Sequence, residues 1–423
     1  MYFSNRRGVR LDSHKKPAIN RPIETPEPSP GAVVPLYTLG RTRLETTVGL
    51  GEKLAKFAPL AISKIRNHAI VSPVSGTLKN IETLTHPFLG RVPCALIQID
   101  PELPPLRMRG YSLDEISEDE IIELSKVAGI IDEYDGLPLY KKLRSFREER
   151  IRLVVCDVVE DEPYVSSGIR CLLERTADAA EGLRILRKAT GAAKAVIAVA
   201  DDGDCKELSK LHSSIEGISL LRVGGAYPIW TGLGKKIKKN FGAFGKVGVQ
   251  ACLALADALQ KGQPQTDIVV TVSGNCIEKA VNVRVPIGTP ISHIVEYCGL
   301  KREPNWIILG DMMSGVPLED LGVPVVPGIR SITALRHRPG PKKAPCIGCG
   351  RCIDVCPVEI MPYFVAKFFA RGETDLALSY GASRCLNCGA CSAVCPSGIE
   401  LAAIMESVLN ESAQKTTEGS DMG

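Results

Sequence analysis

The chain has 423 residues, of which 44% are hydrophobic and 24% charged, and its formal net charge is +4. The length predicts about two to four domains, and no polybasic block interleaved with aromatic residues indicates nucleic-acid binding. No run approaches the roughly 18 consecutive apolar residues of a membrane span, and the polar N-terminus MYFSNRRGVRLDSHKK lacks the apolar core of a secretory signal. We therefore expect a cytoplasmic protein with no membrane span of its own.

The N-terminal part of the chain is predicted to hold a loose arm followed by a β-rich domain. Residues 1–32 are rich in Pro, Arg and polar residues and end in RPIETPEPSPG, which is typical of a flexible arm. Residues 33–113 contain short β-rich runs punctuated by Gly and Pro, and they resemble the barrel-sandwich fold of lipoyl and biotinyl carriers. The exposed carrier lysine at a hairpin tip is missing, so we expect no prosthetic group on this domain.

Residues 114–264 alternate between apolar strands and helices, which predicts a Rossmann-like parallel α/β domain. RIRLVVCDVV (150–159) and AKAVIAVADD (193–202) are continuous apolar runs, as in strands that are buried on both faces. Between them, TADAAEGLRILRKATG gathers apolar residues on one helical face and ends at Gly191, a C-cap position.

Two smaller domains are expected in the C-terminal part. In residues 265–338, the strand TDIVVTVSGN is followed by VNVRVPIGTPISHIVEYCG, a second strand and a helix that ends at Gly299, in a β-grasp-like pattern. PGPKKAP begins the third segment, 339–410, as a linker to a helical cysteine domain. The remaining residues, 411–423, are predicted to form a disordered tail.

Eight of the fifteen cysteines lie in CIGCGRCIDVCP, which begins at Cys346, and in its near-copy CLNCGACSAVCP, which begins at Cys385. The spacing C-x2-C-x2-C-x3-C-P places three thiolates on one tight loop and directs the fourth cysteine to the other cluster. Zinc ribbons also use CxxC pairs, but they lack the third cysteine and the final CP. The predicted ligands are therefore Cys346, Cys349, Cys352 and Cys395 for one [4Fe–4S] cluster, and Cys385, Cys388, Cys391 and Cys356 for the other.

The other seven cysteines are scattered along the chain. Their odd number and the absence of a signal sequence argue against a secreted disulfide framework, and we expect them to be small buried hydrophobic residues. They are Cys94, Cys156, Cys171, Cys205, Cys252, Cys276 and Cys298.

CIGCGRCIDVCPVEIMP and ARGETDLALSYGASRCLNCGACSAVCPSGIEL, followed in importance by VSPVSGTL, EDEPYVSSGIR and GDMMSG, resemble the RnfC subunit of Rnf-type electron-transport complexes. The likeness covers roughly residues 33 to 405. It implies a barrel-sandwich N-terminal domain, an α/β domain related to the flavin-binding subunit of respiratory complex I, a β-grasp (SLBB) domain and a C-terminal two-cluster ferredoxin domain.

The resemblance also implies FMN and NADH on the α/β domain, where a Gly-rich family loop like AGIVGLGGAGFPT wraps the phosphates. In this sequence the segment reads AGIIDEYDGLPLYKKL (128–143), which keeps only Gly136 and gains Asp132, Glu133 and Asp135. A carboxylate about 4 Å from a phosphate costs about 4 kcal/mol at an effective dielectric of about 20. This departure argues against FMN and NADH on this chain, and leaves an inert turn, a remodelled site and retained nucleotide binding as alternatives.

Other positions match the family's nucleotide-binding segments. Tyr227 and Pro228 are kept, although the family's following Glu is lost. A fold-specific turn is the alternative explanation for the two glutamates of EDEPY. The cofactor-binding candidates are Gly136, Glu160, Glu162 and Tyr164.

The sequence thus predicts an RnfC-like protein that relays single electrons through two [4Fe–4S] clusters. The expected partners are proteins, either membrane subunits of the Rnf type or an amino-acid reductase, since some RnfC-like proteins serve reductases such as proline reductase. The chain could then lie peripherally on the inner face of the cell membrane. The alternatives are a flavoprotein subunit that oxidises NADH and splits the hydride into single electrons, and a non-redox scaffold with structural clusters.

Overall fold

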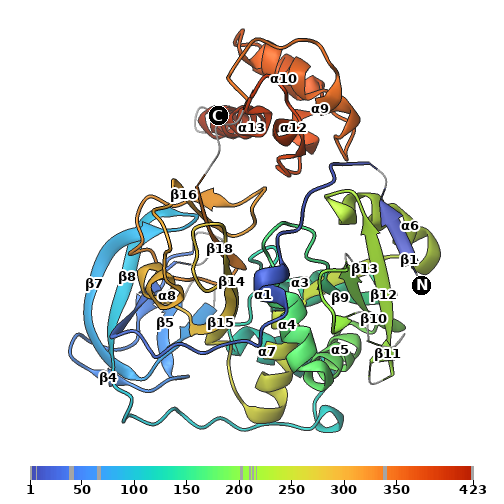
Figure 1. Ribbon diagram of the computed structural model, residues 1–423. Coiled ribbons are helices and arrows are strands. Elements are labelled where there is room, and N and C mark those ends of the chain that lie inside the picture. Colours follow the sequence, from blue (N-terminus) through green and yellow to red (C-terminus); the bar gives the residue numbers. More distant parts are fainter. Residues whose placement is uncertain are drawn as a thin grey trace.

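The computed structural model describes residues 2–5, 7–37, 42–63, 68–200, 203–208, 211, 214–215, 217–336 and 341–420. Figure 1 shows two β-rich parts beside an α/β part, with the cysteine-containing helices above them. Residues 201–202, which end the predicted strand run, and 339–340, which begin the predicted linker, lie outside the described residues. No helix in the described part of the chain is both long and apolar enough to cross a lipid bilayer.

The β-rich N-terminal part consists of two antiparallel sheets that enclose a small apolar core. One sheet has the order β2-β8-β7-β4 and the other β3-β5-β6. The core between them includes Leu60, Leu78 and Ile97. The strands are β2 (Gly31–Pro35), β3 (Glu45–Thr46), β4 (Lys53–Leu54), β5 (Pro59–Ser63), β6 (His68–Val71), β7 (Gly76–His86) and β8 (Gly90–Ile99).

The prediction of a loose arm over residues 1–32 is wrong. β1 (Tyr2–Asn5) pairs in parallel with the edge of the α/β sheet, and α1 (Lys16–Ile19) buries Ala18 and Ile19 completely. In Figure 1, α1 lies between the β-rich parts and the α/β part, and its contacts are with elements of both. Backbone pairing and tertiary burial stabilise this polar segment, and neither is visible in its local composition.

The α/β part is built on a sheet of order β1-β12-β10-β9-β13, whose neighbouring strands run parallel. Every residue of β9 is buried, because helices cover both faces of the sheet. The strands are β9 (Leu153–Val158), β10 (Lys194–Ala200), β11 (Ser214–Ile215), β12 (Ile218–Gly225) and β13 (Phe244–Gly248). The helices are η1 (Leu113–Glu115), α2 (Glu118–Val127), α3 (Leu139–Glu148), α4 (Ser167–Glu174), α5 (Thr176–Thr190), α6 (Ile229–Phe241) and α7 (Val249–Lys261).

The helices divide unequally between the two faces of this sheet. Leu183 of α5 and Leu255 of α7 share one core with Val154, whereas Leu233 of α6 packs with Val155 on the opposite face. As predicted, α5 ends at Gly191, which adopts a left-handed conformation with φ of 68°.

The second β-rich part is a mixed sheet of order β15-β14-β18-β16-β17, against which α8 packs. The predicted helix stop is confirmed, because α8 ends at Gly299 with φ of 70°. The elements are β14 (Asp267–Ser273), β15 (Val281–Pro286), α8 (Ile291–Cys298), β16 (Trp306–Leu309), β17 (Val316–Pro317) and β18 (Ser331–Leu335).

The C-terminal part is helical and carries both cysteine motifs. Its last helix continues through Ser420, so the prediction of a disordered tail from residue 411 is wrong. The seven scattered cysteines elsewhere are all buried, as expected. The helices are α9 (Arg351–Asp354), α10 (Pro362–Phe369), α11 (Thr374–Ser379), η3 (Ala382–Arg384), α12 (Ala390–Ala393) and α13 (Leu401–Ser420).

Candidate electron-transfer site

The two cysteine motifs form loops of the same shape. Gly350 and Gly389 occupy equivalent positions and have left-handed φ values of 73° and 70°, which begin the short helices α9 and α12. In each loop a backbone amide approaches the first sulfur, with Gly348 donating to Cys346 and Asn387 donating to Cys385, both at 3.4 Å. Such amide–sulfur contacts stabilise negative charge on a thiolate, which a cluster ligand must carry.

Cys356, the last cysteine of the first motif, lies with the cysteines of the second. It lines one small cavity together with Cys385, Cys388 and Cys391. Burial, followed by the neighbouring Cys388 and Cys385, raises the pKa of the Cys391 thiol to about 12. Four thiolates this close repel one another in the absence of metal, and iron bound between them would remove that penalty.

The segments at the other ends of the two motifs also meet. Ala344, just before the first motif, donates its backbone amide to the carbonyl of Ser397, just after the second, at 3.0 Å. The Ser397 hydroxyl returns a hydrogen bond to the carbonyl of Pro345, also at 3.0 Å. These contacts hold the chain entering at Cys346 beside the chain leaving from Cys395, although no contact between those two cysteines is recorded.

The second cysteine loop faces the body of the protein, and the first faces outward. Leu386 and Cys388 line a cavity of about 360 Å³ together with Glu162 and Tyr227 of the α/β part. In the first loop Cys349 is exposed and the side chain of Ile347 is 70% exposed. Arg7 also ties the cysteine part to the N-terminal segment through an ion pair with Glu359 at 2.7 Å.

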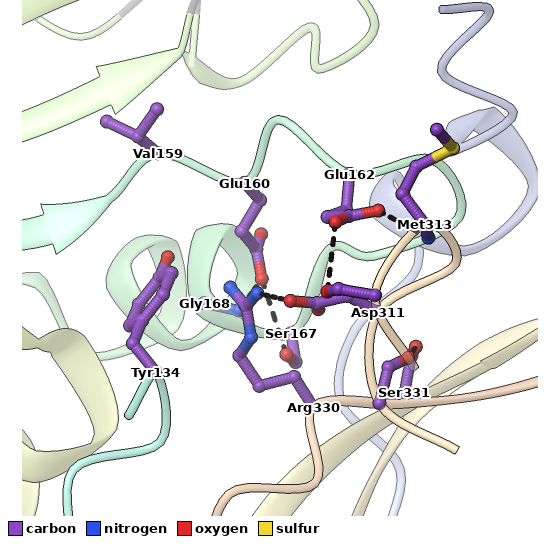
Figure 2. A network of polar contacts seen from close by, with 12 residues as sticks. Tyr134, Val159, Glu160, Glu162, Ser167, Gly168, Asp311, Met313, Arg330 and Ser331 are labelled. Atoms are coloured by element: carbon purple, nitrogen blue, oxygen red, sulfur yellow. Dashed lines mark hydrogen bonds and ion pairs between the residues drawn. The ribbon is translucent and has the colours of Figure 1, made fainter. Parts of the chain in front are cut away.

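A network of carboxylates around Arg330 forms the floor of this cavity (Figure 2). Arg330 is only 6% exposed, is paired with Asp311 and places its guanidinium 4.0 Å from the centroid of the Tyr134 ring. The Glu160 carboxylate accepts hydrogen bonds from the amides of Gly168 at 2.7 Å and Ile169 at 3.0 Å, at the beginning of α4. Burial raises the pKa of Glu160, while these amides and nearby cations oppose that shift.

Glu162 connects three separate segments of the chain. Its carboxylate accepts hydrogen bonds from the Tyr227 hydroxyl at 2.7 Å and from the Met313 amide at 2.8 Å. Burial, followed by the negative charge of Asp311, raises the pKa of Glu162 to about 8. At neutral pH this carboxyl is therefore expected to carry a proton.

The acids that replace the family's glycines are turned toward the sheet and do not project freely. The Glu133 carboxylate accepts hydrogen bonds from the amides of Gln250 at 2.8 Å and Ala251 at 3.1 Å, in the first turn of α7. Burial and then Asp132 raise the pKa of Glu133 to about 8, against these two amides, which favour the charged form.

The other two acids of the loop are paired within the chain. Asp132 accepts a hydrogen bond from the Gly248 amide at 3.0 Å, and Lys142 lies 2.6 Å from Asp132 and 2.7 Å from Asp135. The amides that begin α4 and α7 are the groups that could bind a phosphate at this edge of the sheet, and carboxylates of the chain occupy them. An additional side chain would not fit at Gly248, where a Cβ would lie 2.2 Å from the Glu133 carboxyl carbon. The described residues therefore do not fit the phosphate of FMN.

The structure brings together two of the four cofactor-binding candidates. Glu160 and Glu162 belong to the Arg330 network, and Gly136, with φ of 66°, turns the loop that holds Tyr134. Tyr164 lies apart from them, since its ring stacks on His14 at 4.8 Å and lines a different cavity.

Sequence reasoning missed three members of this network. Tyr134 and Arg330 carry no motif of their own, and Asp311 was recognised only as part of GDMMSG. In the described part of the chain, one polar atom in each of these three side chains has no hydrogen-bond partner: Tyr134 Oη, Asp311 Oδ1 and Arg330 Nη1. Since buried polar atoms are normally paired, this floor has the character of a remodelled polar site.

Comparisons with known proteins match three separate parts of the chain. The family models are an RnfC barrel sandwich hybrid domain over residues 3–102, a Nuo51 FMN-binding domain over 125–231 and a 4Fe-4S dicluster domain over 345–399. The order of these matches follows the barrel-sandwich, α/β and cysteine parts of the fold.

Whole-chain relatives agree with these matches. The chain is 28% identical over 402 residues to the RnfC-type subunit of the proton-translocating ferredoxin:NAD(+) oxidoreductase complex of Clostridium ljungdahlii, a match that covers 89% of this chain and 86% of the relative. It is 29% identical over 414 residues to the corresponding subunit of the ion-translocating oxidoreductase complex of Rhodobacter capsulatus, with 90% and 77% covered. A solved NAD+-reducing [NiFe]-hydrogenase in the H2-reduced state matches with a TM-score of 0.47 and 14% identity over 73% of this chain and 67% of that one. The chain is therefore an RnfC-like electron-transfer protein with two [4Fe–4S] clusters in its C-terminal part.

Proposed function

We propose that this protein accepts single electrons from a protein partner and passes them through its two clusters to a reductase or membrane complex. When bound, each [4Fe–4S] cluster takes up and releases one electron. The contribution of the chain is to hold the two clusters in one compact helical part, with one loop against the body and the other at the surface. The observation that carries the proposal is the occupation of the α4 and α7 amides by Glu160, Asp132 and Glu133.

The proposed ligand sets are crossed between the motifs. Cys356 would complete the cluster of Cys385, Cys388 and Cys391, and the shared cavity of these four residues supports this set. Cys395 would complete the cluster of Cys346, Cys349 and Cys352, and the contacts of Ala344 and Pro345 with Ser397 support that one.

The domain limits and partners are part of the same proposal. We propose domains at 33–113, 114–264, 265–338 and 339–410, with the third of the SLBB β-grasp type; its mixed sheet packed on α8 supports this assignment. By analogy with the relatives, which are named as parts of complexes, the receiving partner would be a membrane complex of the Rnf type, or alternatively an amino-acid reductase. The first partner would place the protein peripherally on the inner face of the cell membrane.

A second candidate function is oxidation of NADH through a flavin on this chain. The match of residues 125–231 to an FMN-binding domain favours it. A flavin would accept a hydride as an electron pair and release the electrons singly to the clusters.

One anaerobic experiment distinguishes the two functions. The holoprotein is purified, its flavin is measured by fluorescence of an acid extract, and cluster absorbance is followed after addition of NADH or of chemically reduced ferredoxin. We expect substoichiometric flavin, no bleaching with NADH and rapid bleaching with reduced ferredoxin. Stoichiometric FMN together with rapid bleaching by NADH would contradict the proposal and establish the second candidate.

A further inference from the structure

A second cavity lies where the N-terminal sheets, the loop 131–138 and the second β-rich part meet. Its volume is about 460 Å³, within the usual range of small-molecule sites of about 300 to 1,000 Å³. Its walls are mostly apolar and come from all three parts of the chain. They include Val34, Val71, Ile131, Leu137, Tyr140 and Val326.

One buried polar group, His86, opens into this cavity. His86 is only 4% exposed, and its Nδ1 accepts a hydrogen bond from the Phe88 amide at 3.0 Å. Burial lowers the pKa of His86 to about 4, so the ring is neutral at pH 7. Because Nδ1 is the acceptor, the single ring proton resides on Nε2, which has no recorded partner among the described residues.

The other uncommitted polar group of the lining is a cation. Lys141 is exposed and no ion pair is recorded for it in the described part of the chain. Asp135 also lines the cavity, but its carboxylate already pairs with Lys142 at 2.7 Å and accepts the Leu137 amide at 3.0 Å. The polar groups left for a ligand, the His86 Nε2–H and the Lys141 ammonium, are therefore both hydrogen-bond donors.

We propose that this cavity binds a small, mainly apolar molecule whose one polar end is an oxygen acceptor, either a carboxylate or a ketone. The apolar body would lie against Val71, Leu137 and Val326, and the acceptor would receive the Nε2–H of His86. A carboxylate would gain an additional interaction with Lys141, whereas a ketone would depend on His86 alone. This site is independent of the proposed electron donor.

Binding at this site would act on the loop 131–138. Ile131 and Leu137 face the second cavity, Asp132 and Tyr134 face the cavity beside Cys388, and Asp135 lines both. The loop is thus a thin wall between the two cavities, and a ligand on one side would stabilise the conformation that it presents on the other.

The test uses three naphthalenes of similar shape as probes, with the anaerobic holoprotein in equilibrium dialysis: 2-naphthoate, 2-acetylnaphthalene and 2-ethylnaphthalene. We expect the first two to bind about threefold to tenfold more tightly than 2-ethylnaphthalene, which has no acceptor, since one net hydrogen bond has about this effect. His86→Phe should abolish this advantage for both acceptors. Lys141→Met should weaken 2-naphthoate and leave 2-acetylnaphthalene unchanged, which distinguishes the carboxylate from the ketone.

Two further variants locate the binding. Leu137→Trp and Val71→Trp each fill the cavity from a different wall and should abolish binding, with retained iron content showing that each variant is folded. Leu50→Trp, at a position that is 62% exposed and outside the cavity lining, is the matched control and should bind as the wild type does. Equal affinity for all three probes, no binding of any of them, or unchanged binding in a folded tryptophan variant of the cavity would overturn the proposal.

Discussion

Gly389 of the second cysteine loop lies directly against the backbone carbonyl of Met313: a Cβ added to Gly389 would be 2.7 Å from that oxygen. The Met313 amide is itself bound by Glu162 at 2.8 Å. A continuous series of contacts therefore runs from the α/β part, through the second β-rich part, to the loop proposed to hold a cluster. Gly350, the equivalent glycine of the first loop, has open space around it.

The first prediction compares Gly389→Ala with Gly350→Ala. Both changes place a Cβ in the left-handed region, with φ of 70° and 73°, at a similar cost of about 1 kcal/mol. Only Gly389→Ala must also displace Met313, because a contact of 2.7 Å is too close for two heavy atoms. We expect faster hydrogen exchange at the Met313 amide in Gly389→Ala alone, measured by mass spectrometry. Equal exchange in both variants would show that the contact does not hold the two parts together.

The second prediction concerns the crossed ligand sets. Cys356→Ser should reduce the iron content from about eight atoms per chain to about four, because one cluster is lost. It should abolish the same electron paramagnetic resonance signal as Cys388→Ser, whereas Cys395→Ser should abolish the other. Cys276→Ser, at a buried free cysteine far from the motifs in sequence, is the control and should keep both signals. If Cys356→Ser and Cys395→Ser affect the same signal, the crossed assignment is wrong.

The third prediction tests the acid that occupies the beginning of α7. Glu133→Ala leaves the amides of Gln250 and Ala251 without their acceptor, and we expect the free energy of unfolding to fall by about 1 to 3 kcal/mol. Asp135→Ala, at an exposed position of the same loop, should change it by less than about 1 kcal/mol. Thermal unfolding of both variants at pH 7 provides the comparison. A similar loss of stability in the two variants would refute a special role for Glu133.

The fourth prediction follows from the pKa of His86, which burial lowers to about 4 in the folded protein, against about 6.5 when unfolded. Between these values the unfolded chain binds a proton that the folded chain does not, so stability falls as the pH is lowered from about 6.5 to about 4. At pH 5 this loss amounts to about 2 kcal/mol. Melting temperatures of wild type and His86→Phe, measured from pH 7.5 to pH 4.5, should diverge because only the wild type loses this contribution. Parallel pH profiles would show that His86 is protonated in the folded state.

The parts of the fold predictable from the sequence are those encoded locally. The motif spacing indicated the [4Fe–4S] clusters, and the apolar run at 153–158 indicated a fully buried parallel strand. Both depend on residues that are close together in the chain.

The features that sequence reasoning did not predict depend on long-range contacts. Glu133 is buried by amides more than a hundred positions away, and Arg330 is matched by Asp311 and Tyr134 from different segments. The polar residues 1–32 were predicted to be loose because their partners, β12 and the faces around α1, are supplied by distant segments. Composition reports how a segment would behave in water, and it does not report which surfaces are available to cover that segment.

The two cysteine motifs are near-copies in sequence, yet the unequal surroundings of their loops imply unequal electron affinities. The second loop lies beside the acidic side chains of Asp161 and Asp311, and the first lies at the surface near Ile347. Nearby negative charge disfavours the addition of an electron, so the cluster of the second loop should have the lower midpoint potential. A redox titration should then resolve two separate one-electron steps, and electrons would flow energetically downhill from the body of the protein toward its surface.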